Sequence, residues 1–130
     1  MRYWNRKAQL LILEMAIATM QKIKVEPGVL RYNYKCHINS VHDAINDGQD
    51  KVAMCFYIDD DYPIIHFINV QNDKFIDNTL GQWSQKFDYY LIRYIEKDSF
   101  WDIEKIFTSY RKELHRKLPF WTRLFITCGF

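Results

Sequence analysis

Apolar residues recur at helical spacing in three parts of the chain. In the first part, Leu10, Leu13 and Ile17 fall on one stripe, and a Pro-Gly pair ends the pattern. The last part begins at Ser99, which is predicted to cap a helix, with Asp102 in the capping-box position. The pattern therefore predicts three helices, over residues 4–24, 36–46 and 99–118.

Runs rich in β-branched and aromatic residues alternate with turn signals in the middle of the chain. They predict four strands, over residues 51–58, 64–70, 74–77 and 87–95. The short connections between the first three strands are typical of hairpins, so the sheet is expected to be antiparallel. We therefore expect an α+β fold over a single domain, 1–130. It is predicted to be a small antiparallel sheet of three or four strands, packed by an N-terminal helix, a short Cys-bearing helix and a C-terminal helix.

The composition is typical of a globular domain with a substantial core. Of the 130 residues, 48% are hydrophobic and 17% are aromatic. The formal net charge is only +2, so the composition gives no general case for nucleic-acid binding. Basic residues do gather in the first and last segments: Arg2, Arg6, Lys7, Lys22, Lys24, Lys105, Arg111, Lys112, Arg116, Lys117 and Arg123. They are interpreted as solvated helix faces, with a nucleic-acid or membrane-surface patch as the weaker alternative.

The N-terminal stretch mimics a secretory signal, because basic residues precede an apolar run that ends in small residues. Gln9 and Glu14 interrupt that run, so an amphipathic helix is the favoured interpretation. No segment reaches the ~18–20 apolar residues of a membrane span. The three cysteines, Cys36, Cys55 and Cys128, lack CxxC spacing and are odd in number. We therefore expect no disulfide framework, no metal or cofactor, and a cytoplasmic location.

Cys36 is the first candidate for chemistry because it opens the helix predicted over 36–46. A thiol at that position feels the helix dipole and the free backbone N–H groups, which favour the thiolate. The helical wheel places it away from the apolar stripe of Ile38, Val41 and Ile45. The alternative interpretation is a small buried hydrophobic residue.

His66 lies in an apolar strand, where a lone histidine is more often a core residue than a catalyst. Pairing Val70 with Lys74 across the turn would set residue 66 opposite residue 78, and other turn registers shift this by a residue or two. Asp77 therefore falls beside His66, where its carboxylate can hold one ring nitrogen and leave the other as a base. The alternative orienting residues are Asn69 and Asn78.

The order of a Cys that opens a helix, a His on a strand and an Asp that ends the next strand resembles a known superfamily. It is similar to the papain-like cysteine hydrolases in their transglutaminase-like form. "YKCHINSV" resembles the Cys motif, and "HFINVQNDKFIDNTLG" resembles the His strand, turn and Asp-Pro-Thr signature, which reads "DNT" here. The likeness covers about residues 32–81. It implies a papain-like core with Cys36 as nucleophile, His66 as general base and acid, and Asp77 as the orienting acid.

The remaining candidates have less support. The backbone N–H of Cys36 is expected to stabilise an oxyanion, and the guesses for a second donor are Trp4, Tyr32 and Asn33. His37 is large where the family keeps small residues. Its spacing from His42 does not place the two on one helix face. "DDDY" (59–62) is interpreted as a solvated turn rather than a metal site. The side chains suspected of lining a cleft are Gln82 and Trp83.

Two functions remain open at this point. The first is a thiol-dependent hydrolase or acyltransferase that acts on an amide (peptide, isopeptide or side-chain amide) of a protein or peptide substrate through Cys36, His66 and Asp77. The alternative is a small, non-catalytic interaction or inhibitor protein of phage type that binds a partner protein. Selective reactivity of Cys36 would favour the enzyme.

Overall fold

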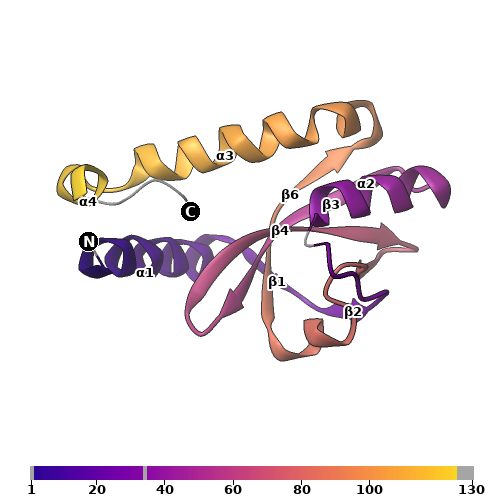
Figure 1. Ribbon diagram of the computed structural model, residues 1–130, viewed down its shortest axis with the longest axis horizontal. Helices are drawn as coiled ribbons and strands as arrows, with labels where there is room; N and C mark the ends of the chain where they lie inside the picture. The colour runs from indigo at the N-terminus through magenta and orange to yellow at the C-terminus, as the bar shows by residue number, and fades with distance from the viewer. Residues whose placement is uncertain (1, 34, 126–130) are drawn as a thin grey trace.

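The computed structural model describes residues 2–33 and 35–125. Its helices are α1 (Arg2–Thr19), α2 (Cys36–Asn46), α3 (Ile103–Lys117) and α4 (Phe120–Phe125), with 3-10 helices η1 (Gly81–Lys86) and η2 (Lys97–Asp102). Its strands are β1 (Gln21–Ile23), β2 (Val25–Pro27), β3 (Lys51–Asp59), β4 (Tyr62–Gln71), β5 (Lys74–Asp77) and β6 (Asp88–Glu96). Figure 1 shows α3 along one side of the sheet, with the start of α1 beside α4 and with α2 beside β3.

The six strands form one mixed sheet in the order β1-β6-β3-β4-β5-β2. Only Lys24 separates β1 from β2, yet these two strands lie at opposite edges of the sheet. β1 pairs with β6 in the antiparallel sense, and β2 pairs with β5 in the parallel sense. One short segment can serve both edges only if the sheet curls round to bring them together. The sheet is therefore a half-barrel.

The α+β class is confirmed, but the predicted sheet of three or four antiparallel strands is wrong. The error lies in the segment after the first helix. That helix was predicted to run to residue 24. The helix ends at Thr19, because the next residues pair with strands far along the chain. Ile23 and Val25 are buried inside the half-barrel. A helical stripe and a pair of three-residue strands look alike in such a short stretch.

The other predicted elements are placed within two residues of their observed ends, apart from the start of the last helix. Ser99 does not cap that helix. It lies in η2, and α3 begins only at Ile103, with no side-chain cap from Asp102. The first helix is amphipathic, as predicted, and its buried side chains join a cluster with Phe56 of β3 and Leu114 of α3. No helix in the described ranges has both the length and the apolar character needed to cross a membrane.

The two faces of the half-barrel hold separate cores. All six strands contribute to the interior core, which includes Ile23, Cys55, Ile68 and Tyr89. The outer face of β3, β4 and β6 packs against the helices instead, through residues such as Phe67. This division matters for the candidate site, because α2 lies on the outer face while the side chain of His66 lies on the inner one.

Candidate active site

Cys36 is the first residue of α2, as predicted, and its side chain is partly exposed. No side chain in the described residues caps this helix end. Since the first N–H groups of a helix have no partner within the helix, they give this end a partial positive charge that favours a thiolate. The thiol also accepts a hydrogen bond from the backbone N–H of Phe67 on β4. Cys36 therefore lies where helix and strand both supply donors to a thiolate.

His66 lies on β4 with only 4% of its surface exposed, and the structure brings it to Asp77. Its Nε2 lies 2.8 Å from Oδ2 of Asp77. A buried carboxylate can only accept, so Nε2 carries the proton and Nδ1 is left for Cys36. The neighbour relation predicted from the hairpin is confirmed, although the register is one residue off. Gln71 pairs with Lys74 across a two-residue turn.

The carboxylate of Asp77 is fully buried and has four hydrogen-bond donors. One oxygen, Oδ1, accepts from the backbone N–H groups of Thr79 and Leu80, at 3.0 and 2.8 Å. The other oxygen, Oδ2, accepts from His66 and from the hydroxyl of Tyr89, the latter at 2.6 Å. Burial alone would raise the pKa of Asp77, but these hydrogen bonds, with that of His66 first, lower it below its usual value. Asp77 is thus held as a fixed anion behind His66.

Tyr89 is a site residue that the sequence interpretation missed. The pairing of β3 with β6 shifts by one residue between Met54 and Cys55, which is a β-bulge. Strict alternation along β6 would put Tyr89 on the same face as Ile95, toward the helices. The bulge reverses the alternation, so Tyr89 faces the interior and reaches Asp77. Nothing in the sequence of β6 marks this reversal.

The electrostatics of the site favour a thiolate beside an imidazolium. Burial raises the pKa of the Cys36 thiol, but hydrogen bonds with His37 and His66 outweigh it and bring the pKa down to about 6. Burial likewise lowers the pKa of His66, but its hydrogen bonds with Asp77 and Cys36 raise the pKa to about 9. Near neutral pH the resting state is therefore the ion pair of a thiolate and an imidazolium.

His37 is a second imidazole beside the thiol, and it too was missed as a partner. Its hydrogen bond with Cys36 raises the pKa of His37, against the effect of burial. The ring is stacked on Phe107 with an angle of 2° between planes and lies edge-on to Phe67. Its Nε2 is buried without a hydrogen-bond partner among the described residues, and Glu104 Oε1 lies 3.9 Å away. The sequence feature that could have indicated this partner is the position of His37 next to Cys36, in the first turn of the helix.

The "DNT" stretch ties the start of α2 to the carboxylate. Asp77 holds His66, and the hydroxyl of Thr79 accepts a hydrogen bond from Asn39 at 3.0 Å. Asn39 lies one turn after Cys36 and is buried. The Nδ2 of Asn39 also donates to Asn33 at 2.9 Å. The helix that carries the thiol and the loop that carries the carboxylate are therefore held together by side-chain hydrogen bonds.

Asn69 and Asn78, the alternative orienting residues, do not hydrogen-bond His66. The buried Nδ2 of Asn69 donates to the backbone carbonyl of Ser40 and to Gln49, both at 2.8 Å. The Nδ2 of Asn78 donates to Asn69 at 3.1 Å, and its Oδ1 accepts from the backbone N–H of Val29. These amides position α2 against β4, and of the three candidates Asp77 is the one that contacts the His66 ring.

The guesses for a second oxyanion donor find no support in the described contacts. Trp4 lies at the start of α1, against Tyr3 and Lys7. Tyr32 is largely exposed, and Asn33 is hydrogen-bonded with Asn39. The candidate donors that remain are the backbone N–H groups of α2.

Other sequence candidates lie outside the site. Cys55 pairs with His66 across β3 and β4 but is fully buried, which raises the pKa of its thiol. Trp83 lies in η1 against Lys86, and neither it nor its neighbour Gln82 lines the cavity between α1, α3 and the β3–β4 hairpin. "DDDY" forms the β3–β4 hairpin turn, and the described residues contain no group of His, Cys, Asp and Glu that could hold a metal ion. Cys128 falls outside the described residues.

The chain matches no family model, no curated protein and no solved structure. A function is therefore inferred from the geometry and the chemistry of Cys36, His66 and Asp77.

Proposed function

We propose that the protein is a thiol-dependent hydrolase or acyltransferase that acts on an amide through Cys36, His66 and Asp77. The observation that carries the proposal is the arrangement of His66. One ring nitrogen is held by a buried carboxylate at 2.8 Å, and the ring is hydrogen-bonded with a thiol at a helix N-terminus. A histidine buried only for packing needs no such thiol, and a thiol buried only for packing keeps a high pKa, as Cys55 does.

The chemistry follows from the ion pair. The Cys36 thiolate attacks the carbonyl carbon, a C–S bond forms, and negative charge moves to the carbonyl oxygen. The uncapped N–H groups of α2 can stabilise that charge. When the intermediate collapses, the C–N bond breaks and the amine leaves with the proton from Nδ1 of His66. The product at this stage is a thioester on Cys36.

The second half returns the site to its resting state. Water gives a proton to Nδ1 of His66 and attacks the thioester, which releases a carboxylic acid and the Cys36 thiolate. In an acyltransferase, an amine takes the place of water and a new amide results. The order Cys, His, Asp that the sequence shares with papain-like, transglutaminase-like hydrolases supports the same assignment of roles.

Acylation by an activated ester tests the proposal without knowledge of the natural substrate. The protein is mixed with p-nitrophenyl acetate, release of nitrophenol is followed, and the acetylated residue is mapped by mass spectrometry. We expect acetylation at Cys36 about 10²-fold faster than that of a free thiol with matched pKa, because His66 orients and supports the thiolate.

Variants complete this test. Cys36→Ala and His66→Ala should lose the fast phase, whereas Cys55→Ala, which removes a buried thiol opposite His66, should keep it. Acetylation of Cys36 at the rate of a free thiol, or a rate unchanged in His66→Ala, contradicts the proposed function.

A further inference from the structure

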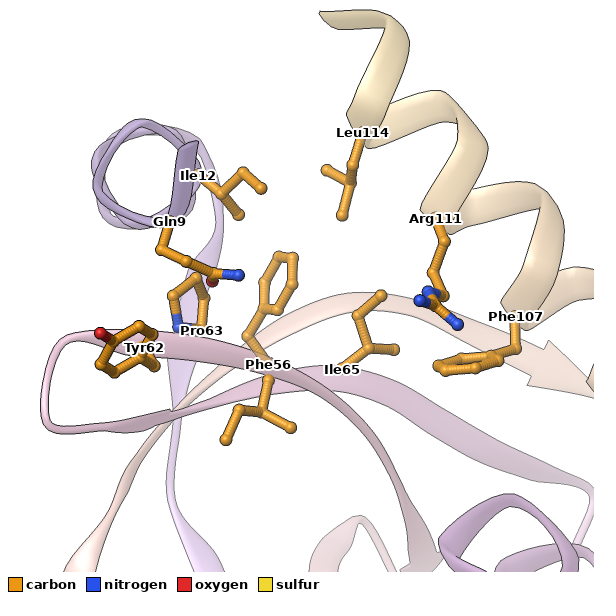
Figure 2. A pocket seen from close by; sticks show the side chains of 10 residues that line it. Gln9, Ile12, Phe56, Tyr62, Pro63, Ile65, Phe107, Arg111 and Leu114 are labelled. Carbon is orange, nitrogen blue, oxygen red and sulfur yellow. The ribbon is translucent and has the colours of Figure 1, made fainter. Parts of the chain in front are cut away.

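α1 has apolar side chains on two opposite sides. Ala8, Ile12 and Ala16 are on the buried side, which joins a cluster with residues of β3 and α3. Figure 2 shows Ile12 directed from α1 toward the cavity between α1 and α3. Leu10 and Ile17, two members of the apolar stripe seen in the sequence, are exposed instead, with 39% and 57% of their surface accessible. A helix with apolar side chains all round is normally covered on every side.

The exposed side of α1 carries one line of five residues, called here the α1 seam: Tyr3, Lys7, Leu10, Glu14 and Ile17. All five are exposed, and their spacing alternates between four and three residues. That spacing keeps side chains on one face of a helix, and it is the spacing at which two helices pack side by side along their length. The seam therefore has the pattern of a contact between two helices.

The two charged members of the α1 seam decide the direction of a second helix. Glu14 is the only acidic residue of α1, and it follows Lys7 by seven residues. In an antiparallel pair with a twofold axis between residues 10 and 11, Lys7 of each copy lies at the height of Glu14 of the other. Leu10 then lies beside its own counterpart, and Tyr3 is within about 1.5 Å of the height of Ile17 of the other copy. A parallel pair would bring like charges together.

We propose that the protein forms a homodimer through the α1 seam, with the two helices antiparallel. A second copy of this chain fits the charges, because each copy supplies one cation and one anion in the order that the other copy needs. Lys7 lies 5.4 Å from the ring of Trp4 and is still exposed. A lipid surface fits the seam less well, because Glu14 lies within the apolar line and anionic lipids repel it. The α1 seam contains none of the proposed catalytic residues, so the dimer is independent of the proposed function.

Sedimentation velocity of the unmodified protein over a range of concentrations tests the proposal. An 18-residue helix is about 27 Å long, so the interface is small and we expect a dissociation constant on the order of 10 µM. The mass should rise with concentration from the 15.9 kDa of one chain toward twice that value. A protein that keeps the mass of one chain up to about 500 µM contradicts the proposal.

Charge reversals test the antiparallel arrangement. Lys7→Glu and Glu14→Lys should each weaken the dimer by about tenfold or more, because like charges then meet at both ends of the seam. The double variant Lys7→Glu/Glu14→Lys should dimerise like the unmodified protein, because the two charges have only exchanged places. Lys112→Glu makes the same charge change at an exposed residue of α3 and is the matched control. Single variants without effect, or a double variant that is not rescued, overturn the antiparallel pairing.

A change at the centre of the α1 seam tests its apolar part. Leu10→Glu sets two carboxylates side by side at the twofold axis and should abolish the dimer, whereas Ile45→Glu, at an exposed apolar residue of α2, should leave it intact. Far-ultraviolet circular dichroism checks that each variant is folded. A dimer that survives in folded Leu10→Glu overturns the assignment to α1. A monomer that binds vesicles of phosphatidylcholine and phosphatidylserine, and loses this binding in Leu10→Glu, overturns the second copy in favour of a lipid surface.

Discussion

The thiol of Cys36 lies between two imidazoles whose surroundings differ. His66 is inside the half-barrel, where Asp77 holds its Nε2 at 2.8 Å and Tyr89 holds the same carboxylate. His37 is on the outer, helix-covered side, where its ring is stacked on Phe107 and its Nε2 has no hydrogen-bond partner among the described residues. Both rings favour the thiolate, but only one is fixed at its far nitrogen.

This difference assigns separate roles to the two rings. A ring whose far nitrogen is held by a buried anion keeps one tautomer and presents the other nitrogen in a fixed direction, as a general acid and base must. The carboxylate closest to His37 is that of Glu104, which is 83% exposed and 3.9 Å away. Such an exposed pair contributes little. We therefore expect His66 to transfer protons and His37 to tune only the pKa of the thiol.

The largest effect on activity is expected when the two histidines are replaced in turn, which tests whether their rings have different roles. His66→Gln should lower kcat for ester hydrolysis by roughly 10³-fold, because no group is left to protonate the leaving group or activate water. His37→Gln should lower it by less than about tenfold, since His66 still transfers the proton. Steady-state kinetics on the same ester decide the matter, and equal losses in the two variants would mean that the two rings do not have separate roles.

The next largest effect on kcat is expected from replacing the carboxylate that holds His66. Asp77→Asn keeps acceptors for the backbone N–H groups of Thr79 and Leu80 but no longer fixes the tautomer of His66. We expect kcat to fall by about 10² to 10⁴-fold while the far-ultraviolet circular dichroism stays unchanged. A variant that turns over at the original rate would remove the orienting role from Asp77.

The pH dependence of activity tests the role expected for His37. Below about pH 6 the thiolate takes up a proton, and above about pH 9 the His66 imidazolium loses one, so activity should be bell-shaped between these values. In His37→Gln the acid limb should move to higher pH by about one unit, because the thiol loses one hydrogen-bond donor. The alkaline limb should stay where it is. Movement of the alkaline limb alone would assign proton transfer to His37.

The smallest effect is expected at the far end of the network. Tyr89→Phe removes one of the four donors to Asp77 but keeps the ring in the interior core. We expect the free energy of unfolding to fall by about 1 kcal/mol and kcat to fall by less than about tenfold. Chemical denaturation and ester kinetics measure both quantities. A loss of kcat as large as that of Asp77→Asn would mean that Tyr89 contributes as much to activity as the carboxylate does.

The parts of the site that the sequence predicted are those fixed by local rules. Cys36 was placed at the start of α2 because an irregular stretch gives way there to a helical pattern. Asp77 was placed beside His66 because a short turn, predicted over residues 71–73, leaves little freedom of register between adjacent strands. Asn72 and Asp73 adopt the positive φ angles that this turn requires, which explains both the hairpin and the one-residue error.

What the sequence did not predict depends on contacts between distant segments. β1 and β2 are strands only because β6 and β5 lie beside them, and three residues alone carry no period. Tyr89 reaches Asp77 only because a bulge opposite Met54 and Cys55 reverses the alternation of β6. His37 lies against Phe107, seventy residues later, whose ring is stacked on the imidazole. Each of these features follows from packing rather than from a pattern along the chain.

We propose that Cys36 is a thiolate at neutral pH because His66 is an imidazolium beside it. The most direct measurement is a titration of the Cys36 thiolate by ultraviolet absorbance, taken as the difference between the free protein and the protein alkylated at Cys36. The predicted midpoint is near pH 6, and it should move upward in His66→Ala. A midpoint at the ordinary thiol value of 9.0, unchanged in His66→Ala, would contradict the account.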